Sequence, residues 1–380
     1  DMVSRGLGDV YKRQRYTFLT FIFIIQLFFY NDWMNGNWII ILISLIPIFT
    51  SMKMVFKKNF KKNIKNSLFL SISVIFGIYI LLYGVHNIGS EKAGLGLWMY
   101  LFALCVMIWE MLSSWSEIDT SLNSKLNFII NLVVPILFGI SLLFLWQVLT
   151  VGLKIPHILL PSPLKIGIAF SNSIPMLWED FQQTFLKAVL SGYFMGCFSG
   201  FIIAIIVDRI PFLQKGLLPL GNLISALPII GIAPIMVMWF GFDWQSKAAV
   251  VVIMTFFPML VNTITGLSVT GQIEKDLLHS YAANYWQNLI LLRIPVSLPF
   301  VFNALKINST LALIGAIVAE FFGTPIVGMG FRISAEIGRL NVDIVWATIL
   351  VAAVSGSMFY ALITICERSL TSWHPSIREN

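Results

Sequence analysis

Residues 127–149 read NFIINLVVPILFGISLLFLWQVL, 23 residues in a row without Asp, Glu, Lys or Arg. A helix needs roughly 20 apolar residues to cross about 30 Å of hydrocarbon at about 1.5 Å per residue. The bilayer core holds no water for unpaired backbone N–H and C=O groups, so a segment that crosses it must be helical. This stretch therefore predicts a transmembrane helix.

Runs of the same kind make up most of the chain. They cover residues 16–30, 38–56, 67–86, 95–114, 127–149, 184–207, 216–240, 248–268, 300–320 and 344–365. Of the 380 residues, 58% are hydrophobic and only 11% are charged. Soluble domains carry roughly 25% charged residues, so this chain has too few charges for a water-facing surface. The sequence predicts an all-α integral membrane protein of about ten transmembrane helices.

The distribution of basic residues predicts how these helices are oriented. With the N-terminus in the cytoplasm, 18 Lys and Arg residues fall in cytoplasmic segments and 7 on the opposite side. Because cytoplasmic loops are enriched in Lys and Arg, both termini are predicted to be cytoplasmic. The 25 basic residues outnumber the 18 acidic ones, and they lie in short loops between apolar runs. This arrangement favours contact with anionic membrane lipid over binding of nucleic acid.

The chain is predicted to have five parts. They are a non-native N-terminal segment (1–15), a four-helix membrane region (16–114), a polar linker (115–126), a second membrane region richer in Gly and Pro (127–373) and a cytoplasmic tail (374–380). The first segment lacks Met at position 1 and lacks the apolar core of a signal peptide. The second membrane region carries the recognisable motifs, so the function is expected there.

The sequence contains no group of residues with the pattern of a catalytic or metal site. Its three cysteines and four histidines are scattered, without the spacing of a metal or redox site. No GxxxxGK motif followed by Ser or Thr is present, so the chain is not expected to hold nucleotide phosphates. We therefore expect no catalytic residue, no metal and no cofactor bound by this chain. An intramembrane enzyme would need a Ser/His, paired-Asp or metal constellation, and none is evident.

Small residues at a spacing of four form a stripe along the sixth apolar run. They are Ala188, Gly192, Gly196, Gly200 and Ala204. Small side chains at this spacing lie on one face of a helix and let a second backbone approach closely. We interpret Gly192, Gly196 and Gly200 as helix-packing residues.

The loop at residues 271–299 is too polar at its start to span a membrane and too long for a tight turn. It reads GQIEKDLLHSYAANYWQNLILLRIPVSLP. The pattern predicts a short helix over residues 275–283, parallel to the inner membrane surface. Such a helix could dock into a groove on a soluble partner. An ordinary surface helix remains the alternative.

Several segments of the second membrane region occur in an order typical of one transporter family. They are Leu160-Pro-Ser-Pro163, ALPIIGIAP at 226–234, Trp239-Phe-Gly241, FFPMLVN at 256–262, the 271–299 loop, and Ala319-Glu320 followed by Gly328-Met-Gly330. With them, residues 155–373 resemble the binding-protein-dependent ABC transporter permeases of the nitrate, sulfonate, taurine and pyrimidine-precursor group. The resemblance implies a six-helix type I ABC importer permease core within residues 127–373.

The resemblance also implies partners and a location. The partners are an ATP-binding ABC subunit that carries the ATP, a periplasmic or lipid-anchored solute-binding protein and a second copy of the permease. The location is the bacterial cytoplasmic (inner) membrane, which the chain would cross several times. Residues 304–320 and 329–334 resemble pyrimidine-precursor or riboflavin-type permeases more than taurine permeases.

The 271–299 loop stands where this family has its ATPase-coupling loop. The residues carried over to that loop are Asp276, Leu277, His279, Tyr281, Ala282, Ile294 and Pro295. Ala282 occupies a position where glycine is usual in the family. Alanine does not readily adopt a positive φ, so we expect the turn at Ala282 to be built differently.

Polar residues in the inner half of the ninth apolar run, together with the glutamate that closes it, are candidates for a translocation path. They are Asn303, Asn308, Ser309, Thr310 and Glu320. The uncharged ones could line a path for a small polar solute or bond between helices. A charge at mid-membrane costs about 2.5–3.5 kcal/mol, which makes Glu320 either a pathway residue or a carboxylate at the membrane boundary.

An ion-coupled secondary transporter without an ATPase partner is the competing interpretation. Such a transporter is typically built from repeats with paired broken helices and polar or charged groups at mid-membrane. The two halves show no convincing repeat, and the apolar runs contain few charges. The importer permease is therefore favoured.

Overall fold

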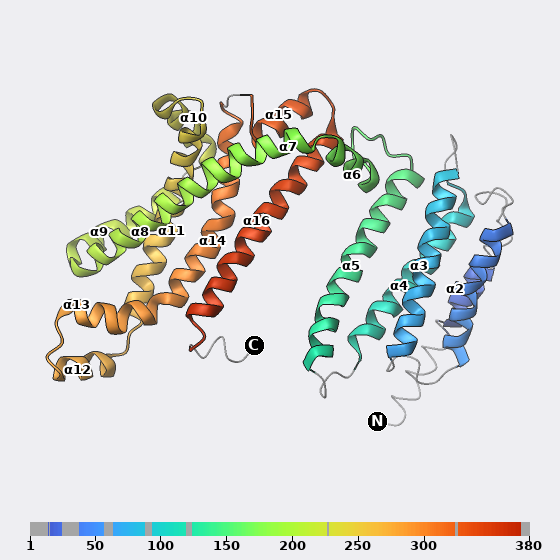
Figure 1. The fold of residues 1–380 in the computed structure, drawn as a ribbon, viewed down its shortest axis with the longest axis horizontal. Helices are drawn as coiled ribbons and strands as arrows, with labels where there is room; N and C mark the ends of the chain where they lie inside the picture. Colours follow the sequence, from blue (N-terminus) through green and yellow to red (C-terminus); the bar gives the residue numbers. More distant parts are fainter. Residues whose placement is uncertain are drawn as a thin grey trace. The chain divides into compact units, whose positions relative to one another are not determined.

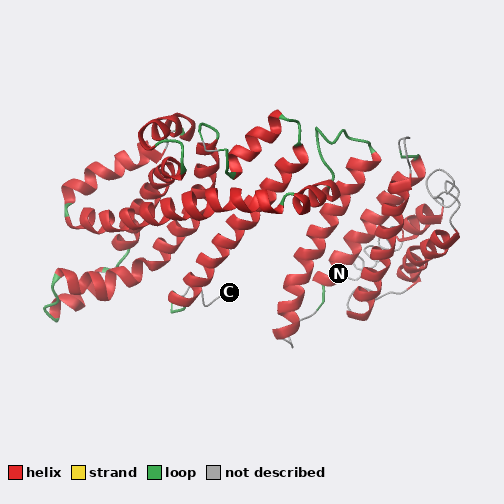
Figure 2. Ribbon diagram, turned by 45° about the horizontal axis from the view of Figure 1, so that its top comes forward, coloured by secondary structure: helices red, strands yellow, loops and turns green. Residues whose placement is uncertain are grey.

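The computed structural model describes residue 14 and residues 16–24, 38–56, 64–87, 93–118, 124–225, 228–323 and 326–373. Within these ranges the regular elements are helices and no strand occurs (Figures 1 and 2). This confirms the predicted all-α fold for the described part of the chain. Nearly all of the 1–15 segment, the 374–380 tail, residues 119–123 of the linker and the second part of the 16–30 run lie outside the described residues.

Seven helices in the described ranges are long and apolar enough to cross a membrane. They span Ile64–His86, Leu95–Ser116, Asn127–Gly152, Ile174–Arg209, Trp244–Ser268, Tyr285–Glu320 and Val342–Leu370. Each contains or overlaps one of the ten predicted runs. The 38–56 run forms α2 (Trp38–Phe56), whose described apolar part, Ile43–Lys53, is shorter.

The single span predicted at residues 216–240 is wrong. The structure has two shorter helices there, α9 (Pro211–Ser225) and α10 (Ile229–Phe240). Pro228 precedes α10 with an extended backbone, at φ −68° and ψ 123°. Proline has no N–H to donate to the preceding turn and disfavours helix in the residue before it, so the helix breaks at this point. Neither piece alone reaches the roughly 20 residues that a straight crossing needs.

Gly192, Gly196 and Gly200 of α8 (Leu190–Arg209) meet Val251, Thr255 and Phe256 of α11 (Trp244–Ser268) in the same order, so these two helices run parallel. The segment therefore returns the chain from the end of α8 to the start of α11 in two pieces, α9 and α10.

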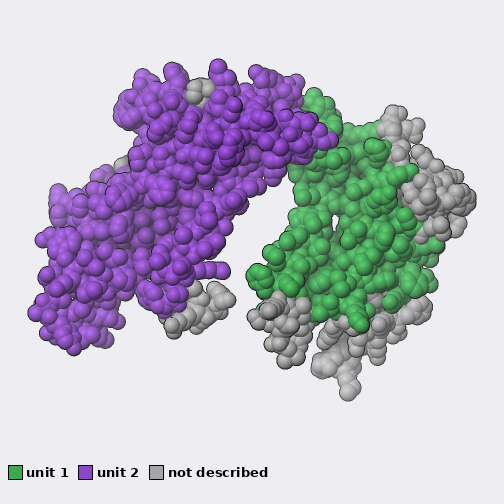
Figure 3. All heavy atoms as spheres, viewed as in Figure 1, with its two compact units in different colours: residues 1–165 green, residues 166–380 purple. Residues whose placement is uncertain are grey.

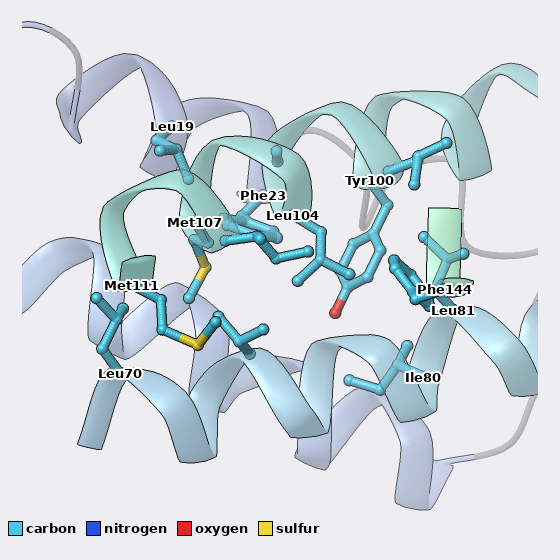
Figure 4. Packing of buried hydrophobic residues seen from close by; sticks show 14 of the residues in the cluster. Leu19, Phe23, Leu70, Ile80, Leu81, Tyr100, Leu104, Met107, Met111 and Phe144 are labelled. Carbon is cyan, nitrogen blue, oxygen red and sulfur yellow. The ribbon is translucent and has the colours of Figure 1, made fainter. Parts of the chain in front are cut away.

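The chain divides into two compact units, residues 1–165 and residues 166–380 (Figure 3). In unit 1, α2 packs on α3 (Ile64–Asn87), which packs on α4 (Leu95–Ser116) and α5 (Ser124–Gly152). Figure 4 shows the buried side chains between these helices, among them Tyr100, Leu104 and Met107 of α4. A Cβ on Gly77 of α3 would lie 2.6 Å from Leu104 Cδ1, so glycine is what allows this close approach.

Buried hydroxyl groups join the helices of unit 1 across their apolar interfaces. The donor–acceptor distances are 2.8 Å for Thr50 to Ser73, 2.7 Å for Ser67 to Ser114, 2.9 Å for Trp115 Nε1 to Ser71 and 2.9 Å for Tyr16 to the Glu110 carboxyl. Hydrogen bonds of this kind help to fix the partner and the register of membrane helices.

In unit 2, one long helix leads into the bundle. It consists of α7 (Ile174–Phe181), a π-helical stretch η3 (Gln182–Val189) and α8 (Leu190–Arg209), preceded by α6 (Pro163–Asn172) (Figure 1). The remaining helices are α11 (Trp244–Ser268), α12 (Gln272–Ser280), α13 (Tyr285–Asn288), the π-helical η4 (Leu289–Arg293), α14 (Ile294–Glu320), α15 (Met329–Gly338) and α16 (Val342–Leu370). Both α8 and α14 pack along α11, which therefore forms the centre of the unit.

The glycine stripe of α8 faces α11. A Cβ on Gly192 would lie 2.6 Å from Val251 Cβ, one on Gly196 would lie 2.0 Å from Thr255 Oγ1, and one on Gly200 would lie 2.6 Å from the Phe256 carbonyl oxygen. The two backbones therefore approach so closely that no side chain fits between them at these three turns.

Candidate functional site

Helix α12 projects from one end of unit 2 (Figure 1) and has no buried residue, although Lys275 and Leu278 are half-buried. Ile273 and Leu277 of α12 and Tyr281, which directly follows it, are spaced four residues apart and are 83%, 57% and 78% exposed, whereas Leu278 is half-buried. Residues at this spacing form one stripe along a helix. Asp276 lies on α12 as well and accepts a hydrogen bond of 3.1 Å from the Gln272 amide. The helix starts three residues before the predicted 275–283 helix and ends before Tyr281.

The turn after α12 is closed by two backbone hydrogen bonds. The Ala282 N–H donates to the His279 carbonyl at 2.9 Å, and the Ala283 N–H donates to the Leu278 carbonyl at 3.1 Å. This pair of bonds defines a Schellman motif, whose C′ residue adopts the left-handed conformation. Ala282 has a φ of 55°. The expectation that alanine would avoid a positive φ here is therefore wrong.

The far end of the loop is anchored to the bundle. Arg293, the last residue of η4, forms a two-pronged ion pair with Asp208 near the end of α8, with N–O distances of 2.7 and 2.6 Å. Ile294 and Pro295 follow as the first residues of α14, where a proline lacking its N–H is tolerated. Asp208 was not predicted from the sequence, because nothing in its neighbourhood indicates a partner 85 residues away.

At the end of α14, the Glu320 carboxylate is buried and fully engaged. Thr184 donates a hydrogen bond of 2.7 Å to Oε1, and the Gly330 amide donates one of 2.6 Å to Oε2. Gly330 lies in the first turn of α15, where unpaired N–H groups and the helix dipole favour a negative charge. Glu320 therefore caps α15 and is 3% exposed.

A second buried carboxylate holds the same segment. Asp180 accepts hydrogen bonds of 2.8 Å from the Gly328 amide and 2.7 Å from Arg332 Nε. Asp180 and Thr184 lie one turn apart on the long helix, and Glu320 closes α14. The long helix, α14 and α15 thus meet in one polar cluster, and of its side chains only Glu320 was predicted from the sequence.

The loop before α11 carries a further polar group, Asp243. It caps α11 by accepting a 2.8 Å bond from the Trp244 amide, and it accepts a 2.7 Å bond from the Gln183 amide. These bonds, that from Gln183 foremost, lower the pKa of Asp243 below its ordinary value. Lys247, 1% exposed, donates to the carbonyl oxygens of Phe242 at 2.5 Å and of Asp243 at 3.2 Å.

The structure separates the uncharged path candidates into two groups. Asn303 and Thr310 lie on the exposed side of α14. Asn308 and Ser309 are fully buried, and Asn308 donates a 2.8 Å hydrogen bond to the Thr255 carbonyl of α11. The Asn303 amide lies 3.5 Å from Asn262 Oδ1 of α11, so a pair of amides faces outward there.

The charged side chains of α11 and α14 are Lys247, Lys306 and Glu320. Lys306 forms an ion pair with Glu367 of α16 at 2.8 Å. Lys247 and Glu320 form the hydrogen bonds described above, so each charged side chain of these two helices is bonded to a group within unit 2. Among the described residues, no group of three or more His, Cys, Asp or Glu side chains could hold a metal ion.

Comparison with known proteins identifies the architecture that surrounds these contacts. Residues 192–372 match the family model of the binding-protein-dependent transport system inner membrane component. The formylaminopyrimidine transport permease protein of Halalkalibacterium halodurans is 31% identical over 243 residues, which cover 63% of this chain and 95% of that protein. The chain belongs to this permease family.

Other relatives extend the comparison. The riboflavin transport system permease protein of Chloroflexus aurantiacus is 28% identical over 64% of this permease and 90% of its own length. The taurine transport system permease protein of Escherichia coli is 24% identical over 61% of this permease and 86% of its own length. The family confirms the resemblance in the sequence and identifies the permease as a multi-pass membrane protein. The family match begins within α8 and includes the α12 loop and α15.

Proposed function

We propose that this permease is the membrane-spanning subunit of an ATP-driven importer that moves a small polar solute across the bacterial inner membrane. The observation that carries the proposal is α12, a helix that buries none of its residues and exposes an apolar stripe within the family match. Exposed apolar side chains are common on the membrane helices, but α12 is a polar helix, and an apolar stripe on a polar, water-facing helix marks an interaction site. In this proposal, the partner that meets the stripe is the soluble ATPase of the importer.

In this proposal, Ile273, Leu277 and Tyr281 insert into a groove of the ATPase. An amphipathic helix bound in a groove uses anchors spaced three or four residues apart along one face. Asp276 and His279 provide polar contacts on either side of the stripe. The chain has no phosphate-binding loop of its own, so the ATP is bound and hydrolysed by the partner.

The other partners follow from the family description. We propose a solute-binding protein, periplasmic or lipid-anchored, on the side opposite the ATPase, which the words binding-protein-dependent in the family description support. A second copy of the permease would complete the path. Both termini are proposed to be cytoplasmic, which places α12 on the same side as the ATPase.

We propose further that the solute is uncharged. A path along α11 and α14 would present Asn262, Asn303 and Thr310, whose amides and hydroxyl bond neutral polar groups. The charges on these two helices are bonded within the protein, so an anionic solute would find no counter-charge there. Relatives named for sulfonates and taurine match too, but the relatives named for formylaminopyrimidine and riboflavin are more similar in sequence, at 31% and 28% identity against 23–25%, which favours a heterocycle.

The test is uptake into proteoliposomes that contain the permease with its ATPase and binding protein. Leu277→Asp should abolish co-purification of the ATPase and reduce uptake to background, because it places a charge in the centre of the stripe. Ile337→Asp is a matched control, since Ile337 is 54% exposed on the short helix α15. ATP-independent uptake by the wild-type permease alone would exclude the importer and favour a secondary transporter.

A further inference from the structure

The ion pair between Asp208 and Arg293 lies at the base of the α12 loop. The side chains are only 7% and 16% exposed, and both guanidinium nitrogens that face Asp208 are bonded at 2.6–2.7 Å. A two-pronged Arg–carboxylate pair has a defined orientation, unlike a contact between single atoms. The pair therefore joins the end of α8 rigidly to η4.

The same guanidinium also holds α11. Arg293 donates from Nε at 3.2 Å and from a terminal nitrogen at 3.0 Å to the Leu267 carbonyl oxygen. Leu267 lies in the last turn of α11, where carbonyls have no partner within the helix. One side chain thus connects α8, α11 and the start of α14, the three helices that form the centre of unit 2.

The loop itself is fastened to this point through α13. Tyr285 donates a hydrogen bond of 3.3 Å to Asp208, and the Arg209 guanidinium stacks on the rings of Tyr285 and Trp286 at 5.3 and 5.7 Å. Asn284 and Gln287 form a capping box that fixes the start of α13. In contrast, α12 has no buried residue.

We infer that Asp208 and Arg293 transmit the movement of α12 to the membrane helices, an inference that rests on the proposed ATP-driven import. A force on α12 reaches α13 through the turn at Ala282, and the Asp208–Arg293 pair passes it to α8, α11 and α14 together. Without the pair, α13 and η4 would move relative to α8, and the displacement would be absorbed within the loop. Asp208 and Arg293 are positioning residues, since neither meets the solute or the nucleotide.

The experiment measures how many solute molecules enter proteoliposomes per ATP hydrolysed by the complete complex. The variant is the double substitution Asp208→Asn with Arg293→Met, which removes the pair without leaving a single buried charge. We expect the ATPase to co-purify and hydrolyse ATP, while the solute-to-ATP ratio falls about tenfold, within the range for residues that carry coupling between sites. Arg293→Lys keeps the positive charge but cannot form the two parallel hydrogen bonds of a guanidinium group. It should therefore give an intermediate solute-to-ATP ratio.

The control is another ion pair of similar burial, Lys306–Glu367, which joins α14 to α16 away from the loop. Replacing it by Met and Gln should lower thermal stability but leave the solute-to-ATP ratio unchanged. If the Asp208–Arg293 double variant has the wild-type solute-to-ATP ratio, the inference is wrong but the proposed function stands. If the double variant does not fold, a wild-type ratio in Arg293→Lys has the same consequence. Wild-type uptake that needs no ATPase would overturn the proposed function and this inference with it.

Discussion

The hydroxyl of Thr184 bonds two groups that lie far away in the sequence. It donates to the Glu320 carboxylate at 2.7 Å and accepts a hydrogen bond of 2.7 Å from the Met329 amide. One small side chain thereby holds the end of α14 and the start of α15 on the long helix. All three groups are buried, so water is not available to replace a lost bond.

Thr184→Val should therefore destabilise the permease. Valine has nearly the shape of threonine but leaves the Met329 amide and one Glu320 oxygen without this partner, at about 1–3 kcal/mol for a buried group. The measurement is the thermal unfolding midpoint of the purified protein in detergent. Thr364→Val is the matched control, because the Thr364 hydroxyl bonds the Tyr360 carbonyl of its own helix. Equal midpoints for the two variants would contradict the prediction.

Gly330→Ala should disrupt the packing of α15 against α14. The added Cβ would lie 2.2 Å from the Ile317 carbonyl oxygen and 2.8 Å from Glu320 Cβ, so backbone would have to move. Overpacking of this kind typically costs about 1–3 kcal/mol. Gly338→Ala, in the same helix, meets nothing within 4 Å and should leave stability unchanged or raise it. Unfolding midpoints of both variants measure the difference.

Ala282→Gly should stabilise the turn between α12 and α13. Ala282 has a positive φ, where a non-glycine residue is disfavoured by about 1–2 kcal/mol, and part of that gain is offset by the greater freedom of glycine when unfolded. Hydrogen exchange of the amides of Ala282 and Ala283 reports on the two bonds that close the turn. Ala283→Gly, at a residue without a positive φ, should speed the same exchange. Faster exchange in Ala282→Gly would refute the expected gain.

Two asparagines of α14 should respond in opposite ways to substitution by leucine. Asn303 is exposed and belongs to the proposed path, so Asn303→Leu should reduce uptake of a neutral solute about 2- to 10-fold, the value of one hydrogen bond, without loss of stability. Asn308 is buried and bonds α11, so Asn308→Leu should lower stability by about 1 kcal/mol. Uptake assays and unfolding midpoints are measured on both variants. Loss of stability in Asn303→Leu with unchanged uptake would exclude Asn303 from the path.

Sequence reasoning located the α12 loop because its polarity interrupts a chain of apolar runs. It predicted the short helix to within three residues at each end but missed the positive φ of Ala282, since alanine in itself disfavours that conformation. It also predicted one span across Pro228, because the apolar composition continues through the break between α9 and α10. The ion pair of Asp208 with Arg293 could not be predicted from the sequence, because each residue alone is typical of a charge at a helix end.

By itself, the sequence determined that the chain is helical and membrane-spanning. The length of an apolar run and its lack of charge are local properties, and they alone decide whether a segment is stable as a helix in the bilayer. The tertiary structure alone decided which polar groups meet. Asp180, Thr184 and Glu320 converge on α15 only once α8 and α14 have packed on α11. The rotation of α14 against α11 likewise exposes Asn303 and buries Asn308, five residues further along. That rotation is fixed by close contacts between distant helices, which composition and spacing do not encode.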